Sequence, residues 1–152
     1  MLISTKGAIS VSQVSILVAE DNELWRDFIG LTLRMESSFE IISEVVDGLQ
    51  AVLIAEQRQP TIALLDIGLP RLNGLDAARS IRELAPNTKI VFLSGDQDVE
   101  VVKAALAVGS GYVLKSDAGD DLVTAIHSAV RGERVLSRQL AGLGITLDQE
   151  EK

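Results

Sequence analysis

Five short apolar runs alternate with helical patterns along this 152-residue chain. The clearest run is Thr-Ile-Ala-Leu-Leu at 61–65, which ends on Asp66 and is closed by Gly68 and Pro70. A run this short and this apolar is typical of a strand buried on both faces of a parallel sheet. Parallel strands need crossover connections, and the helical patterns supply them. The alternation therefore predicts an α/β fold, in which helices cover both sides of a five-stranded parallel sheet.

The expected elements follow one another as strand and helix. The strands are expected at 13–18, 39–45, 61–65, 89–93 and 112–114, and the helices at 22–35, 48–57, 73–84, 99–108 and 117–132. Asn22 and Asp117 are suitable caps for the first and last helices. In the first helix, apolar residues recur at helical spacing: Leu24, Phe28 and Leu31, joined by Ile29, Thr32 and Met35.

Length and composition indicate one domain without disulfides. We expect a domain at 13–137, a flexible segment at 1–12, and a tail or the start of a linker at 138–152. A chain of this size buries enough surface to need no disulfide, and it has no cysteine. The N-terminal segment lacks the apolar region of a signal peptide, and no apolar run approaches the roughly 20 residues of a membrane span. We expect a cytoplasmic protein that does not enter a membrane.

The net charge is −8, and no Lys/Arg cluster offsets it locally. Such a chain repels phosphate backbones. Direct nucleic-acid binding by this chain is therefore not expected.

Polar side chains end four of the five apolar runs. Glu20 and Asp21 follow the first run, Asp66 the third, Ser94 the fourth and Lys115 the fifth. The carboxyl ends of parallel strands meet at one edge of the sheet, where ligands bind in such folds. Three carboxylates gathered there repel unless one takes up a proton or a hard cation neutralises them. Mg²⁺ is the usual choice for oxygen ligands.

These residue types suit phosphoryl transfer onto a carboxylate, because that chemistry depends on positioning and on charge stabilisation. A metal ion would orient the phosphoryl oxygens and neutralise developing charge. Asp66 is then the nucleophile. Lys115 and the hydroxyl of Ser94 would hold the transferred group.

Four motifs occur in a characteristic order: Val-Ala-Glu-Asp-Asn at 18–22, Leu-Leu-Asp-Ile-Gly-Leu-Pro at 64–70 with Asn-Gly at 73–74, Leu-Ser-Gly at 93–95, and Gly-Tyr-Val-Leu-Lys at 111–115. Together they resemble the receiver domain of two-component response regulators, over about residues 13–137. The resemblance implies a CheY-like, flavodoxin-like fold, doubly wound with strand order 2-1-3-4-5.

The resemblance also implies a reaction and its partners. Asp66 would accept a phosphoryl group from a sensor histidine kinase, a phosphotransfer protein or a small phosphodonor. Asp21, Asp66 and the backbone carbonyl of Gly68 would bind Mg²⁺, and Glu20 would act through water. The chain would catalyse only its own phosphorylation and dephosphorylation.

Further roles follow from the same resemblance. Ser94 and Tyr112 would form a switch, in which Ser94 moves to the phosphoryl group and Tyr112 turns inward to change a partner-binding surface. Gly68 and Asp96 would tune dephosphorylation. The last helices would serve as the interface of a homodimer.

The chain departs from many receivers after Lys115, where Ser116 stands in place of proline. Because a cis bond is costly without proline, we expect a trans peptide there.

The closing Arg-Gly-Glu-Arg-Val-Leu-Ser at 131–137 resembles receivers that precede LuxR-type helix-turn-helix domains. Residues 138–152 are too short for such an output domain, which leaves the receiver part of a transcriptional regulator or a stand-alone receiver.

Three other functions are weaker interpretations. A Mg²⁺-dependent phosphohydrolase of the haloacid-dehalogenase type would need an aspartate where Gly68 stands. A receiver that docks a partner without phosphate would usually lack part of the acidic cluster or the lysine, and here the set is whole. A flavin protein would need a Gly/Ser/Thr-rich loop after the first strand.

Two other residues are expected to have structural roles. Trp25 is expected to pack on the first helix and His127 to lie at the surface.

Overall fold

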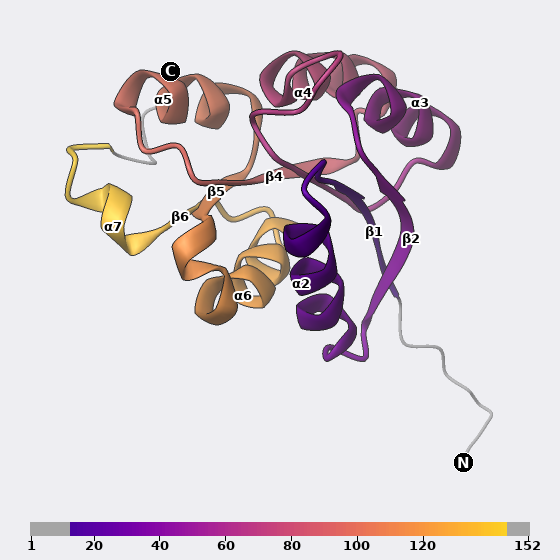
Figure 1. Cartoon of the computed structure of the whole chain (residues 1–152), viewed down its shortest axis with the longest axis horizontal. Helices are drawn as coiled ribbons and strands as arrows, with labels where there is room; N and C mark the ends of the chain where they lie inside the picture. The colour runs from indigo at the N-terminus through magenta and orange to yellow at the C-terminus, as the bar shows by residue number, and fades with distance from the viewer. Residues whose placement is uncertain (1–12, 146–152) are drawn as a thin grey trace.

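The structure, a computed structural model, describes residues 13–145. A six-stranded sheet in the order β2-β1-β3-β4-β5-β6 lies between layers of helices (Figure 1). All neighbouring strands are parallel. The strands are β1 Val14–Ala19, β2 Phe39–Val45, β3 Ile62–Leu65, β4 Lys89–Ser94, β5 Gly111–Leu114 and β6 Val135–Leu136. The predicted doubly wound fold and the order of its first five strands are confirmed.

The helices occupy both faces of the sheet. They are α2 Glu23–Arg34, α3 Gly48–Arg58, α4 Gly74–Leu84, α5 Val99–Val108, α6 Ala118–Val130 and α7 Arg138–Ala141, with a 3₁₀ turn, η1, at Lys115–Asp117. Helices α3, α4 and α5 cover one face, and α2 and α6 cover the other (Figure 1). Each face has its own apolar core, because successive strand residues point to opposite sides: Leu65 and Phe92 lie in one core, Leu64 and Val91 in the other.

Only one of the apolar sides of α2 faces the core. Leu24 and Leu31 are 80% and 69% exposed, whereas Ile29 and Leu33 are buried. Two apolar stripes run along this helix, and its packing against β2 and α6 covers only one of them. Helical periodicity cannot choose between two apolar stripes, so only the packing of α2 shows which of them faces the core.

The chain continues to pack beyond the boundary expected at residue 137. Strand β6 adds to the edge of β5, with Tyr112 beside Leu136 in the register. Leu140 and Ile145 are buried in the same apolar core as Tyr112. The sequence analysis predicted neither β6 nor α7. The expected segment 1–12 and residues 146–152 of the expected tail lie outside the described residues.

Two local predictions about helix starts had different outcomes. The side chain of Asn22 caps α2 by accepting a hydrogen bond from the backbone N–H of Trp25 at 3.0 Å. Asp117 occupies the cap position of α6, but its side chain makes no capping bond; it accepts from Gln139 at 2.8 Å instead. Between residues 13 and 145 no peptide bond is cis, so the trans bond expected before Ser116 is confirmed.

None of the helices in residues 13–145 is long and apolar enough to span a membrane.

Candidate functional site

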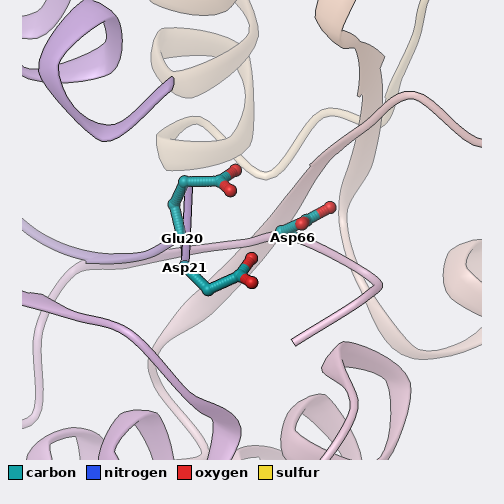
Figure 2. Close-up of side chains that lie close together, drawn as sticks. All are labelled: Glu20, Asp21 and Asp66. Carbon is teal, nitrogen blue, oxygen red and sulfur yellow. The ribbon is translucent and has the colours of Figure 1, made fainter. Parts of the chain in front are cut away.

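Three carboxylates meet at the carboxyl ends of two adjacent strands. Glu20 and Asp21 follow β1, and Asp66 follows β3 (Figure 2). One oxygen from each carboxylate lies within 4.8 Å of the others. The backbone holds the two strand ends together, because the N–H of Asp66 donates to the carbonyl of Ala19 at 3.1 Å. The predicted convergence of these residues is observed.

Lys115 approaches the carboxylates from the end of β5. Its Nζ lies 3.0 Å from Oε1 of Glu20 and 3.6 Å from Oδ2 of Asp66. The side chains of Lys115 and Asp66 are only 16% and 12% exposed. A single lysine offsets part of the negative charge of three carboxylates, which leaves the cluster suited to a further cation.

Glu20 is the most enclosed member of the cluster, at 1% exposure. Burial raises the pKa of its carboxyl, and the backbone N–H of Asn22 and the ammonium of Lys115 partly offset this effect. Its Oε2 accepts from the N–H of Asn22 at 3.0 Å, whereas its Oε1 makes no hydrogen bond and has only the ionic contact with Lys115. A buried carboxylate oxygen whose one partner is the ammonium of Lys115, beside two more carboxylates, fits a site for Mg²⁺ and its bound water.

Ser94 and Tyr112 are both inside the protein. Ser94 is 4% exposed, and its Oγ accepts from the N–H of Asp96 at 3.1 Å. Tyr112 is fully buried, and its hydroxyl donates to the backbone carbonyl of Asp96 at 2.8 Å. Burial raises the pKa of Tyr112 to about 12. The structure therefore describes Tyr112 in an inward position.

The two residues expected to tune dephosphorylation lie in loops beside the cluster. A Cβ placed on Gly68 would meet no atom within 4 Å, so this turn is open to water. The carboxylate of Asp96 accepts from the N–H of Asp98 at 2.9 Å. The carboxylate of Asp96, which sequence analysis assigned to dephosphorylation, thus stabilises the loop before α5.

The loop after Asp66 is held by residues whose roles the sequence analysis missed. The N–H of Gly48 donates to the carbonyl of Pro70 at 3.2 Å. Asp47, 3% exposed, pairs with Arg71 at 3.5 Å. Arg71 adopts a left-handed φ of 70°, a conformation that this pairing helps to hold.

Gly74 is a second missed position. Its N–H donates to the carbonyl of Ile67 at 2.8 Å, and its Cα lies so close to the backbone of Asp66 that a Cβ would overlap the Asp66 carbonyl oxygen. The Asn-Gly pair at 73–74 signals a helix start in the sequence. Only the packing of α4 against the end of β3 shows that glycine is required there.

Trp25 contacts Phe28 on its own helix, as expected, with the ring centroids 5.5 Å apart in an edge-to-face arrangement. The ring also lies beneath Nζ of Lys115, 5.2 Å from the centroid, which sequence analysis did not predict. His127 is partly exposed, lies against the ring of Phe39 and has its Nε2 3.6 Å from Glu36.

The fold and the site together define a class of protein: a doubly wound sheet that carries an acidic cluster, a lysine and a buried hydroxyl at one edge. Comparison with known families agrees. The family described as the response regulator receiver domain matches residues 16–127. The chain belongs to this family and is the receiver domain of a two-component response regulator.

Two bacterial regulatory proteins are among the relatives of this chain. The chain is 32% identical to the transcriptional regulatory protein DegU of Brevibacillus brevis over 82% of its length, and 34% identical to the nitrate/nitrite response regulator protein NarL of Escherichia coli over 83%. These matches cover 53% and 59% of the relatives, so the chain spans just over half of their length.

A solved structure gives the same picture of the fold. The crystal structure of a LuxR-family two-component response regulator from Aurantimonas superposes with a TM-score of 0.82 at 26% identity, covering 86% of this chain and 94% of that one. The matched relatives are named as regulators.

Proposed function

We propose that this receiver accepts a phosphoryl group on Asp66 in a Mg²⁺-dependent reaction. The observation that carries the proposal is the position of Lys115, whose Nζ lies 3.6 Å from Oδ2 of Asp66 inside a cluster of three carboxylates. A nucleophile, an acidic metal site and a fixed cation are the parts that phosphoryl transfer requires.

In the reaction, a carboxylate oxygen of Asp66 attacks the phosphorus of the donor, and the bond from phosphorus to the leaving group breaks with its electron pair. Asp21, Asp66 and the carbonyl of Gly68 would hold Mg²⁺, with Glu20 acting through water; the ion supplies charge neutralisation and orients phosphoryl oxygens. Lys115 and the hydroxyl of Ser94 then hold the transferred group. The acyl phosphate is later hydrolysed at the open turn of Gly68, beside Asp96.

The signal leaves the site through Ser94 and Tyr112. Tyr112 lies on β5, and Ser137 connects this strand to the segment that follows α6. The N–H of Ser137 donates to the carbonyl of Tyr112 at 3.0 Å, and its Oγ accepts from the N–H of Leu114 at 2.8 Å. Any shift of β5 on phosphorylation is therefore transmitted to residues 135–145. In a longer regulator, this segment would lead to an output domain that controls transcription.

The partners that we propose are a sensor histidine kinase or phosphotransfer protein as donor, and a second copy of the chain. Leu31, an apolar side chain of α2 that is 69% exposed, would form part of the surface that receives a helical donor. Dimerisation through the last helices is tested by sedimentation with and without beryllofluoride. A monomer under both conditions would refute it.

Phosphorylation is tested by mass spectrometry after incubation with Mg²⁺ and acetyl phosphate. We expect one added phosphoryl group on the wild-type chain, none on Asp66→Asn, and none when a chelator removes Mg²⁺. An Asp66→Asn variant that is modified equally would refute the proposal. If the wild-type chain is never modified by acetyl phosphate and never binds beryllofluoride, the result would favour a receiver that docks a partner without phosphate. Continuous release of phosphate from many phosphate esters would favour a phosphohydrolase.

A further inference from the structure

We propose that Trp25 is a positioning residue for Lys115, holding the ammonium group at the mouth of the acidic cluster. This inference rests on the phosphoryl-acceptor function proposed above. The Nζ of Lys115 lies 3.0 Å from Glu20, 3.6 Å from Asp66 and 5.2 Å from the centroid of the Trp25 ring, over its face. A cation at this distance over an indole ring is attracted by the negative charge of the ring face.

The backbone of Trp25 and one edge of its ring each have a defined contact. Its backbone N–H donates to the side chain of Asn22 at 3.0 Å, which places Trp25 in the first turn of α2, directly after the acidic strand end. Phe28, one turn later, meets the ring edge-to-face at an interplanar angle of 86°. Phe28 in turn lies near Gly119 at the start of α6, where a Cβ would be 4.0 Å from its ring. The capping bond thus places the Trp25 backbone, and the contact with Phe28 limits the movement of the indole.

An aromatic surface matters here because the two carboxylate contacts of Lys115 change during the reaction. Asp66 becomes an acyl phosphate, and a cation bound by the cluster would compete with Lys115 for the negative charge of Glu20 and Asp66. The attraction of the Trp25 ring does not depend on either carboxylate. It therefore keeps Lys115 within reach of the incoming phosphoryl oxygens when the other contacts weaken.

The test compares Trp25→Leu, which removes the aromatic face, with Trp25→Phe, which retains one. From the usual range of cation–π interactions we expect the maximal rate of phosphorylation by acetyl phosphate to fall about 2- to 30-fold in Trp25→Leu. The concentration of acetyl phosphate giving half-maximal rate should change little, and Trp25→Phe should restore most of the rate. Leu24→Ala, a neighbour that is 80% exposed, is the matched control and should behave as wild type.

A double-mutant cycle separates positioning from a general structural effect. In a Lys115→Ala background, Trp25→Leu should have no further effect on beryllofluoride affinity measured by calorimetry. An effect of equal size with and without Lys115 would overturn the proposal, as would a wild-type rate in Trp25→Leu or a failure of Trp25→Phe to recover it.

Nuclear magnetic resonance tests the contact without any phosphorylation. The ε-methylene protons of Lys115 should be shifted upfield by the indole ring current in the wild type and in Leu24→Ala, and the shift should disappear in Trp25→Leu. No upfield shift in the wild type would overturn the placement of Lys115. A wild type that shows the shift but is never phosphorylated would refute the proposed function and leave the contact established.

Discussion

Replacing Gly74 by alanine should damage the site without touching any of its reacting groups. A Cβ at this position would lie 2.8 Å from Cα of Ile67 and 2.9 Å from the carbonyl carbon of Asp66, and would overlap the carbonyl oxygen of Asp66. Optimal carbon–carbon contacts are about 3.5–4.0 Å, so α4 or the backbone of Asp66 must move by about 1 Å. Overpacking of this kind costs about 1–3 kcal/mol of unfolding free energy.

Displacement of the nucleophile should cost more in rate than in stability. A misplacement of about 1 Å can lower a reaction rate by about 100-fold. We therefore expect Gly74→Ala to remain folded, to lose about 1–3 kcal/mol in urea unfolding, and to accept phosphoryl from acetyl phosphate about 100-fold more slowly. Gly95→Ala is the matched control, because a Cβ there meets no atom within 4 Å. A Gly74→Ala variant with wild-type rate and stability would show that the reasoning about this contact is wrong.

The remaining predictions concern burial, capping and the surface of α2. Tyr112, the only tyrosine, should form tyrosinate with a midpoint at about pH 12 in a near-ultraviolet titration, because burial raises its pKa in the folded state. Its contribution to stability is therefore fully present below about pH 10 and is lost as the pH rises through about 12. A midpoint near 10 in the folded protein would contradict its burial. Asp47→Ala should cost about 1–2 kcal/mol in urea unfolding, because it removes the cap of α3, whereas Asp76→Ala, at an exposed ion pair, should cost less than about 1 kcal/mol; equal losses would count against the role of Asp47 as a cap. Leu31→Lys should change the unfolding free energy by less than about 0.5 kcal/mol, whereas Leu33→Ala should lose about 2–5 kcal/mol; the reverse order would return Leu31 to the core.

The sequence alone was sufficient to predict the sheet, its first five strands and the edge at which the polar residues gather. Buried parallel strands are short apolar runs, so 61–65 and 89–93 were recognisable without any partner. Alternation of strands with helices then places every strand's carboxyl end on one side. This is why Glu20, Asp21, Asp66 and Lys115 could be assigned to one site.

Features that depend on which surfaces meet could not be predicted. Two apolar stripes on α2 satisfy the same periodicity, and only the position of the helix on the sheet exposes Leu31 and buries Leu33. Strand β6 has two residues, too few to give an alternating pattern, and forms because the edge of β5 is available to pair with it.

The site itself shows the same division. Which residues carry the chemistry followed from local sequence, because charge and nucleophilicity belong to the side chain. How precisely these residues are held did not follow from local sequence. The pairing of Asp47 with Arg71, the need for glycine at 74 and the indole of Trp25 under Lys115 each depend on a contact between different parts of the fold. Such contacts are decided only when the helices pack on the sheet, since distances between elements are a property of the tertiary structure.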